Sequence, residues 1–435
     1  TAAEPPTSKG STMTSERLKR KPIVLHIITG LGDGGAEAVL YNLIRSAINF
    51  EHKIISLSGP GKYGPMMEAE GFEVFCLRLR SSIPSPMKLL KLPNLVRQAQ
   101  PDVVQCWMYH ADLLGGYAAW HADVRAIVWG LHHTTLDVQS SKWTTRLLVL
   151  LNVRVSDWLP HRIITCSKKG GVTHREIGFP AEKMVLVHNG YNTAAFIPDD
   201  TARTSFRAEF NIGDDQLLLG CVARYDPQKD HHNLLQAFTK VIKARPNAHL
   251  LLIGPGLTTE NTEIKAQISK KGLSDHVTLL GPRLDIPMVM NGLDLHVLGS
   301  AYGEAFPNVL SEAMSCGTPC VATNVGDSAT ILGKTGCVVP ARDSHALAAA
   351  ILDVSHHISD PAVQTACRDH ILQNFTLEHM VAGYTQVWCE SIAEIQGGYL
   401  TPKRVKAKHF ACHANIIYWR LRNHIKQVIN KIMRR

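Results

Sequence analysis

The chain has 435 residues, too many for one hydrophobic core, and fits two domains of about 200 residues each. Apolar residues make up 45% and charged residues 19%, a composition typical of a globular α/β protein, which excludes a chain disordered throughout. The net charge of +9 is local, because residues 401–435 contain ten Lys or Arg and no Asp or Glu, which leaves −1 for residues 1–400. This distribution argues against a nucleic-acid-binding body and against a nucleic-acid partner.

The ten cysteines stand singly, without a Cys-x-x-Cys pair, as expected for reduced thiols in the cytoplasm. No run approaches the roughly 18 apolar residues of a membrane-spanning helix. Residues 1–20 are polar and without periodicity, so we expect them to be disordered. Together these features predict a cytoplasmic protein.

A strand is predicted at 23–28, and a glycine-rich turn follows it. Gly32, Gly34 and Gly35 would let the backbone approach a phosphate closely at a helix start. A nicotinamide-dinucleotide loop has similar glycine spacing, but it needs an acidic residue at the end of the second strand. Glu51 precedes that strand instead, which disfavours the dinucleotide interpretation.

Strands and helices then alternate, and a strand at 126–131 ends in two histidines. Open α/β sheets bind ligands at the carboxyl ends of their strands, which makes His110, His132 and His133 candidates. The chain has 22 histidines, so a structural role for each remains the alternative.

A long apolar helix is predicted at 142–159, with Arg146, Arg154 and two tryptophans. Core packing is one interpretation of this pattern, and contact with a lipid is the other. Residues 193–214 are polar and contain proline and aspartate, which is typical of a linker between domains.

A second βα series starts with a strand at 217–223, and Arg224 and Lys229 follow it. Two cations five residues apart, on either side of an Asp-Pro turn, can hold one pyrophosphate from two directions. The alternative is a surface loop with solvated side chains.

The strand-like run 293–298 is followed by Gly299 to Met314, the stretch on which the functional interpretation mainly rests. Pro307 is predicted at the first helical position. Free backbone N–H groups would then point out of the helix start, and two carboxylates, Glu304 and Glu312, would flank them. A ligand with hydroxyls at both ends and phosphate in the middle would bind the N–H groups through its phosphate and the two carboxylates through its hydroxyls. The N–H groups expected to be free belong to Phe306, Asn308 and Val309.

This stretch resembles the Glu-x7-Glu signature of family 4 retaining glycosyltransferases, the group 1 glycosyltransferases of bacterial cell-surface polysaccharide synthesis. Gly-Gly-Ala-Glu at 34–37, the Asn-Gly turn at 189–190, the Arg224 and Lys229 pair and Gly-Pro-Arg at 281–283 are similar to motifs of the same family. The resemblance implies the GT-B fold, in which two Rossmann-like, doubly wound parallel-sheet α/β domains face each other across a cleft.

The resemblance and the composition together predict six segments. They are a disordered segment at 1–20, an acceptor domain at 21–195, a linker at 196–214, a nucleotide-sugar domain at 215–375, a crossover helix at 376–396 and a basic tail at 397–435. The apolar and basic residues of the tail alternate at helical spacing, so contact with anionic lipid through residues 401–435 is one possibility and docking on the protein itself is the other.

The activity that the resemblance implies is retaining, metal-independent transfer of a sugar to a hydroxyl of a lipid-linked or polysaccharide acceptor in lipopolysaccharide or other cell-surface glycan synthesis. A UDP-sugar is the expected donor, and it is a co-substrate, so no cofactor and no metal ligand are predicted. The implied catalytic residues are His133, Arg224, Lys229 and Glu304, and His110 and Asp112 are candidates for the acceptor side. The implied donor-binding residues are Gly32, Gly34, Gly35, Arg224, Lys229, Arg283, Glu304, Ala305, Phe306, Pro307, Asn308, Val309 and Glu312.

Three rivals remain at this point. A sugar-nucleotide 2-epimerase would share the architecture but would be expected to carry extra carboxylates in its first half. A nicotinamide-dependent oxidoreductase would use only the first glycine-rich loop. A non-catalytic membrane scaffold would use only the tail and would leave the other motifs unexplained.

Overall fold

The computed structural model describes residues 20–79, 86–132 and 143–397. Residues 1–19 of the predicted disordered segment, His133 and residues 398–435 of the predicted tail lie outside the described residues.

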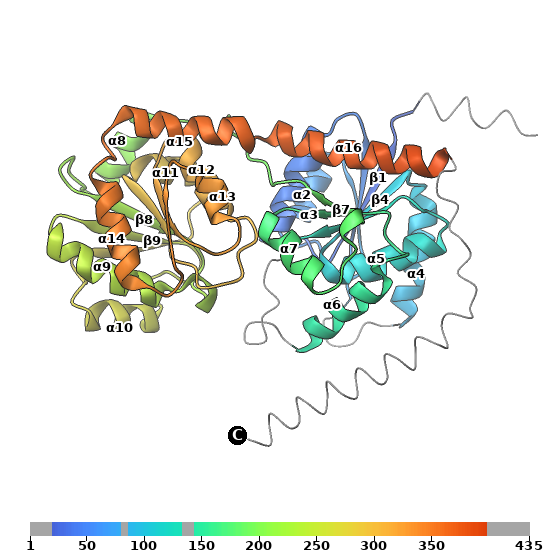
Figure 1. The fold of residues 1–435 in the computed structure, drawn as a ribbon, viewed down its shortest axis with the longest axis horizontal. Coiled ribbons are helices and arrows are strands. Elements are labelled where there is room, and N and C mark those ends of the chain that lie inside the picture. Colours follow the sequence, from blue (N-terminus) through green and yellow to red (C-terminus); the bar gives the residue numbers. More distant parts are fainter. Residues whose placement is uncertain (1–19, 80–85, 133–142, 398–435) are drawn as a thin grey trace, which may run out of the picture. The chain divides into compact units, whose positions relative to one another are not determined.

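Within the described residues, seven parallel strands form the first sheet, in the order β3-β2-β1-β4-β5-β6-β7 (Figure 1). The strands are β1 Ile23–Ile28, β2 Glu51–Ser56, β3 Glu73–Cys76, β4 Val103–Trp107, β5 Ile127–Leu131, β6 Arg162–Thr165 and β7 Met184–Leu186. β1, β4 and β5 are buried at every position, as their apolar sequences require. The strand order reverses between β1 and β4, where doubly wound sheets leave room for a ligand.

The second sheet, in the part of the chain that the structure describes, has six parallel strands in the order β10-β9-β8-β11-β12-β13. The strands are β8 Leu218–Val222, β9 His249–Ile253, β10 Val277–Gly281, β11 Leu295–Leu298, β12 Cys320–Thr323 and β13 Cys337–Val339. The order reverses here between β8 and β11, so the loops that follow these two strands meet at one edge. The predicted motifs at 224–229 and 299–307 occupy these two loops.

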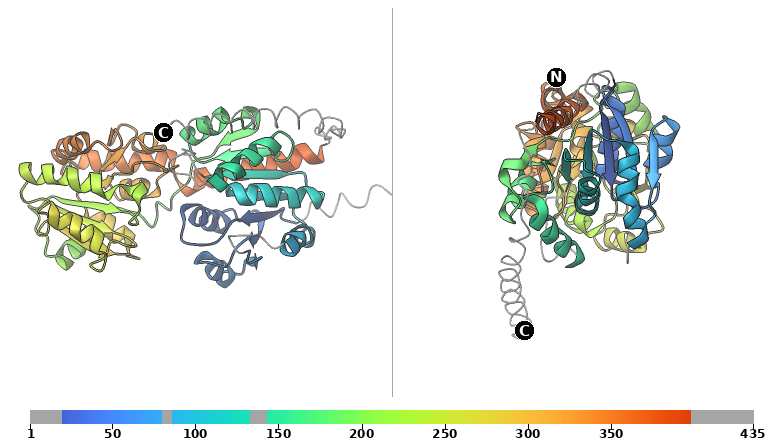
Figure 2. Two further views of the ribbon diagram at one scale, coloured as in Figure 1. Left: turned by 90° about the horizontal axis from the view of Figure 1, so that it is seen from below. Right: turned by 90° about the vertical axis from the view of Figure 1, so that its right-hand side faces the viewer.

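Helices cover both faces of each sheet, as the three views in Figure 1 and Figure 2 show. Those of the first domain are α2 Gly35–Ser46, α3 Tyr63–Ala69, α4 Pro86–Ala99, α5 Met108–His121, α6 Trp143–Ser156 and α7 Lys168–Glu176, with the short η1 Ala181–Lys183. Those that follow are α8 Asp200–Glu209, η2 Pro227–Lys229, α9 His231–Ala244, α10 Thr262–Lys270, α11 Ile286–Gly292, α12 Asn308–Ser315, α13 Ser328–Leu332, α14 Ser344–Ser355, α15 Pro361–Asn374 and α16 Leu377–Gln396. The prediction of two doubly wound α/β domains is confirmed.

The stretch predicted as a linker, 196–214, contains the helix α8, which the composition did not reveal. The helix begins after Asp199, whose carboxylate accepts a hydrogen bond from Ala202 N at 2.9 Å. Phe206 of α8 is fully buried and belongs to the same hydrophobic cluster as Leu218 and Met290. The helix therefore belongs to the core of the second domain.

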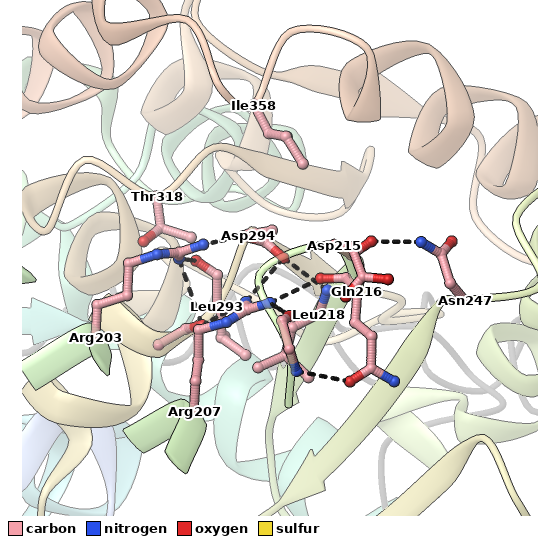
Figure 3. Close-up of polar contacts among 12 residues, drawn as sticks. Arg203, Arg207, Asp215, Gln216, Leu218, Asn247, Leu293, Asp294, Thr318 and Ile358 are labelled. Atoms are coloured by element: carbon pink, nitrogen blue, oxygen red, sulfur yellow. Dashed lines mark hydrogen bonds and ion pairs between the residues drawn. The ribbon is translucent and has the colours of Figure 1, made fainter. Parts of the chain in front are cut away.

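A buried ionic network fixes α8 to the second sheet (Figure 3). Asp294, just before β11, accepts from Arg203 at 2.5 Å and from Arg207 at 3.1 Å. Its carboxylate also accepts from Leu218 N at 2.7 Å, and Arg207 donates to Gln216 O at 2.8 Å. Side-chain exposure is 3% for Arg207 and 9% for Asp294, so neither charge is solvated by bulk water.

The helix predicted at 376–396 is present as α16, and it packs on the first sheet. Trp388 donates from Nε1 to Gln105 Oε1 at 3.0 Å and lies edge-on to His26 with ring centroids 5.7 Å apart. Tyr384, one turn earlier, stacks on Trp107 of β4 at 5.6 Å. The chain thus returns to its first domain after completing the second.

The outgoing and returning segments between the two domains are joined by backbone hydrogen bonds. Tyr191 N donates to Phe375 O, and Leu377 N donates to Tyr191 O, both at 3.0 Å. Gly190 lies so close to Thr376 that a Cβ at this position would overlap the Thr376 carbonyl oxygen. The position therefore requires glycine for close backbone approach.

Candidate functional site

The candidate site is formed by the two loops that follow β8 and β11. A backbone hydrogen bond of 2.8 Å from Ala301 N to Gln228 O joins them. Gly303, with a positive φ of 79°, lies against the Gln228 side chain, and a Cβ there would come within 3.1 Å of Gln228 Cδ. The loops therefore form one surface at the carboxyl edge of the sheet.

Lys229 and Glu304 form an ion pair at the centre of this surface. Lys229 Nζ lies 2.5 Å from Glu304 Oε1, and the side chains are 12% and 9% exposed. Ser300 Oγ donates to the same Glu304 oxygen at 2.7 Å, and Thr323 Oγ1 donates to Ser300 O at 2.6 Å. The structure thus brings together two predicted residues that are 75 positions apart in the chain.

Arg224, the second predicted cation, is held at the rim of the surface. Its Nε donates to Asp226 at 3.2 Å and its Nη2 to Gln228 at 3.0 Å, and the side chain is 54% exposed. Burial alone would raise the pKa of Asp226, but the Gln228 N–H and Arg224 outweigh it, so the pKa lies below its ordinary value. Arg224 would need to leave these neighbours to reach a phosphate beside Lys229.

The helix α12 begins one residue later than predicted. Pro307, expected at the first helical position, is the residue that precedes the helix, with φ of −70° and ψ of 106°. The N–H groups of Asn308 and Val309 lie in the first turn, where helical N–H groups have no partner within the helix. Phe306 lies outside the helix, and its ring is buried against His188 at 5.0 Å.

Glu312 is the second predicted carboxylate and lies one turn inside α12. Its side chain is partly buried, and burial raises the pKa of the carboxyl to about 7. At neutral pH this carboxyl is therefore only partly ionised, whereas an ordinary exposed glutamate would be fully ionised.

The glycine-rich turn of the first domain meets the start of α12. A Cβ on Gly35 would lie 3.8 Å from Asn308 Nδ2, and Tyr191 donates from its hydroxyl to Asn308 Oδ1 at 2.8 Å. A Cβ on Gly32 would meet nothing within 4 Å, whereas the Glu37 carboxylate occupies the space beside Gly34. Among the three predicted glycines, Gly32 thus faces open space and Gly35 lies beside a predicted donor-binding residue.

The acceptor-side candidates differ in their surroundings. His110 is exposed in the first turn of α5. Asp112 is fully buried and accepts from Gly130 N at 3.2 Å, and burial raises its pKa well above the ordinary value. This burial indicates a structural role for Asp112. His132, the neighbour of the candidate His133, stacks on Trp107 with centroids 5.1 Å apart.

The Arg283 side chain is fully engaged by acidic neighbours. Its guanidinium donates to Glu209 at 2.6 and 3.1 Å and to Asp285 at 2.8 and 2.6 Å. These contacts occupy the guanidinium, so the binding of a nucleobase by the backbone of Arg283 stays a prediction.

Two residues of the site were missing from the prediction. Ser300 donates to Glu304 and so orients its carboxylate, and Gln228 connects Arg224 to the Gly303 turn. Both lie inside the predicted motifs, but only the fold reveals their partners. No three His, Cys, Asp or Glu side chains are grouped as a metal site would require within the described ranges.

Two protein families match this chain, and their matches fall on different domains. The family described as glycosyltransferase family 4 matches residues 33–195. The family described as group 1 glycosyl transferases matches residues 216–357, which contain the two loops of the candidate site. The first match spans β2 to β7 of the first sheet, and the second spans every strand of the second sheet.

Curated relatives carry the same kind of name. A putative glycosyltransferase, EpsF of Bacillus subtilis (strain 168), is 27% identical over 327 residues, which cover 71% of this chain and 79% of that protein. An Escherichia coli enzyme named UDP-Gal:alpha-D-GlcNAc-diphosphoundecaprenol alpha-1,3-galactosyltransferase is 21% identical over 301 residues, which cover 68% of this chain and 77% of that enzyme.

Solved structures share the fold. Anabaena Alr3699/HepE in complex with UDP superposes with a TM-score of 0.75 at 21% identity, covering 84% of this chain and 99% of that one. The same protein with UDP-glucose gives a TM-score of 0.72. At this identity the likeness shows the fold alone.

Proposed function

Because the chain belongs to glycosyltransferase family 4, the group 1 glycosyltransferases, we propose that it moves a sugar from a UDP-sugar to a hydroxyl of a lipid-linked or polysaccharide acceptor, with retention and without a metal. The observation that carries this proposal is the Lys229–Glu304 pair, whose glutamate lies in the loop that leads into α12. Neither matching family, nor any relative or structure described above, carries the name of an epimerase or an oxidoreductase, so these rivals gain no support.

Lys229 stabilises the leaving group in this proposal. As the anomeric bond breaks, negative charge grows on the diphosphate, and a preorganised cation in a poorly solvated position stabilises that charge strongly. Lys229 is already held in place by Glu304 and is only 12% exposed, so little reorganisation is required. The N–H groups of Asn308 and Val309 and, after rotation, the Arg224 guanidinium add to this stabilisation.

The two carboxylates hold hydroxyls at the two ends of the donor. Glu304, oriented by Ser300, accepts hydrogen bonds from the sugar, and Glu312 accepts them from the ribose. The exposed backbone of Gly32 and the backbone of Arg283 contact the phosphates and the base. In this proposal His133 contacts the donor sugar and His110 contacts the acceptor.

Cytoplasmic location and contact of residues 401–435 with anionic lipid belong to the same proposal. Within the described ranges, no helix combines the length and the apolar composition that crossing a bilayer demands.

A thermal-shift comparison tests the donor class. UDP is expected to raise the melting temperature more than GDP or ADP, because the proposed donor carries UDP and the tighter ligand stabilises the folded state more. A ligand at 100 times its Kd stabilises the folded state by about 2.7 kcal/mol. Glu312→Gln should reduce the UDP shift, whereas Asp215→Ala, an exposed position outside the site, should leave it unchanged. An equal response to all three nucleotides would contradict the proposed donor. Conversion of the UDP-sugar without an acceptor would favour the epimerase.

The affinity for UDP is expected to depend on the protonation of Glu312. The pKa of Glu312 is about 7 in the free protein, and hydroxyl donors from the ribose favour the ionised form, so binding lowers that pKa. The affinity for UDP should therefore be highest above pH 7 and should fall by up to about tenfold per pH unit below it. Calorimetric titration from pH 5.5 to 8 measures this dependence. An unchanged pH profile in Glu312→Gln would assign the effect to another group.

A further inference from the structure

The side chain of Tyr191 reaches from the segment that leaves the first domain to the start of α12. Its backbone is fixed on both sides, because Tyr191 N donates to Phe375 O and Leu377 N donates to Tyr191 O, both at 3.0 Å. Its ring lies nearly parallel to the ring of Phe306, with centroids 6.3 Å apart and an interplanar angle of 13°. Only 6% of the residue is exposed. The fold therefore fixes the position of the Tyr191 hydroxyl.

This hydroxyl holds the side-chain amide of Asn308, the first residue of α12. Tyr191 donates from its hydroxyl to Asn308 Oδ1 at 2.8 Å. Burial raises the pKa of Tyr191 well above its ordinary value, so the phenol keeps its proton and remains a donor. Because the amide oxygen receives this proton, the NH₂ group of Asn308 is held on the other side of the amide, away from Tyr191.

The NH₂ group of Asn308 is available to a ligand. No hydrogen bond from Asn308 Nδ2 is present among the described residues, and this nitrogen is not one of the enclosed polar atoms that lack a partner, so it is open to solvent. It lies toward the glycine-rich turn of the first domain, since a Cβ on Gly35 would be 3.8 Å away. The structure thus holds one amide rigidly by its oxygen and leaves its two N–H donors unused.

The groups around this amide favour an anionic ligand. The backbone N–H groups of Asn308 and Val309 lie in the first turn of α12 and have no acceptor within the helix. Lys229 contributes a cation through its pair with Glu304, four residues before Asn308. Several donors and one cation at a helix start suit the oxygen atoms of a diphosphate.

We propose that Tyr191 is a positioning residue for the donor: it orients the Asn308 amide so that Nδ2 donates a hydrogen bond to a phosphate oxygen of the nucleotide-sugar. The inference rests on the proposed function and adds a side-chain donor to the backbone N–H groups of α12. An amide carries no net charge, so the strength of its contact depends on direction. Fixing that direction before the ligand arrives lowers the entropic cost of binding, and Tyr191 supplies this fixation.

Calorimetric titration of the full chain with UDP and with uridine, which lacks both phosphates, tests the proposal. Tyr191→Phe keeps the ring and removes the hydroxyl, and it should raise the Kd for UDP about fivefold. Asn308→Asp leaves an oxygen for Tyr191 to donate to, but replaces the NH₂ donor by a negative oxygen beside the phosphates, and should raise the Kd for UDP about 100-fold. The Kd for uridine should stay within about twofold in both variants, because uridine has no phosphate to contact.

The melting temperature separates this role from a structural one. An acidic residue in the first turn of a helix is stabilising, so Asn308→Asp should melt no lower than the unchanged protein although it binds UDP more weakly. Tyr384→Phe is the matched control for Tyr191→Phe, because it removes a buried hydroxyl that has no hydrogen-bond partner among the described residues. It should bind UDP as the unchanged protein does.

A double-variant comparison shows whether Tyr191 acts through Asn308. Asn308→Ala should raise the Kd for UDP about tenfold, and adding Tyr191→Phe should cause no further loss, because the amide that the hydroxyl orients is already absent. Independent losses that add in the double variant would overturn the role of Tyr191.

The same titrations separate failure of this inference from failure of the proposed function. If UDP binds the unchanged protein, Tyr191→Phe and Asn308→Asp equally tightly, the inference is overturned and the proposed function stands. An equal loss of affinity for UDP and uridine would also overturn it, since the effect would then not involve the phosphates. If the unchanged protein does not bind UDP, the proposed function and the inference are overturned together.

Discussion

Lys229→Ala is expected to lower kcat by about 10²–10³-fold, equivalent to about 3–4 kcal/mol of transition-state stabilisation. Lys229 is the cation that lies in the partly desolvated centre of the site, 2.5 Å from Glu304, where its charge acts on the diphosphate with little screening by water. The measurement is steady-state transfer from a UDP-sugar, with kcat and KM determined separately. A larger effect on kcat than on KM would indicate that the charge acts mainly in the transition state.

Two further variants separate catalysis from the structural ion pair. Lys229→Ala leaves Glu304 buried without its cation, so part of any loss could come from a displaced loop. Lys229→Ala combined with Glu304→Gln removes both charges. This double variant should be as inactive as Lys229→Ala but should have the melting temperature of the unchanged protein. Lys243→Ala, exposed on α9, is the control and should retain full activity. Normal kcat in Lys229→Ala would remove the central element of the proposed mechanism.

Asp294→Ala is expected to cost about 3–5 kcal/mol of the free energy of unfolding. The carboxylate neutralises Arg203 and Arg207 and also accepts from Leu218 N, so its removal leaves a 3%-exposed guanidinium without its counter-ion. Urea unfolding followed by circular dichroism measures the change. Five of the seven tryptophans lie in the first domain, Trp388 lies in α16 and Trp419 lies outside the described residues, so tryptophan fluorescence does not report the second sheet.

The control for this change is Asp215→Ala, because Asp215 lies near the same network but is exposed. Its replacement should alter stability by no more than about 0.5 kcal/mol. A loss below about 1 kcal/mol in Asp294→Ala would mean that Arg207 finds sufficient compensation in Gly213 O and Gln216 O, to which it also donates.

The sheets could be predicted from sequence because a parallel strand covered on both faces reads as a continuous apolar run, as in Ile23–Ile28. The helix α8 could not, because its buried side is supplied by one phenylalanine and by the arginines of an ionic network whose acidic partner is some 90 residues away. Local periodicity carries no information on such distant partners.

The candidate site could be predicted from sequence only in part. Strand order reveals which loops meet, but packing decides how the side chains are arranged. Loops after adjacent strands meet at one edge, so the proximity of Lys229 and Glu304 follows from the strand order. The rotamer of Arg224, the support from Ser300 and the burial of Asp112 depend on packing in three dimensions. For the same reason the apolar pattern of α6 did not reveal that one of its faces is turned outward.

The hydrogen-bonded junction of Tyr191 with Phe375 and Leu377 has a mechanical consequence. Both covalent crossings between the sheets pass through this single point, so any opening or closing of the enzyme must bend a two-stranded joint, and neither crossing can swing independently. A side chain at Gly190 would push the two strands apart. The joint therefore restricts the enzyme to few directions of movement, and substrate access must be achieved along them.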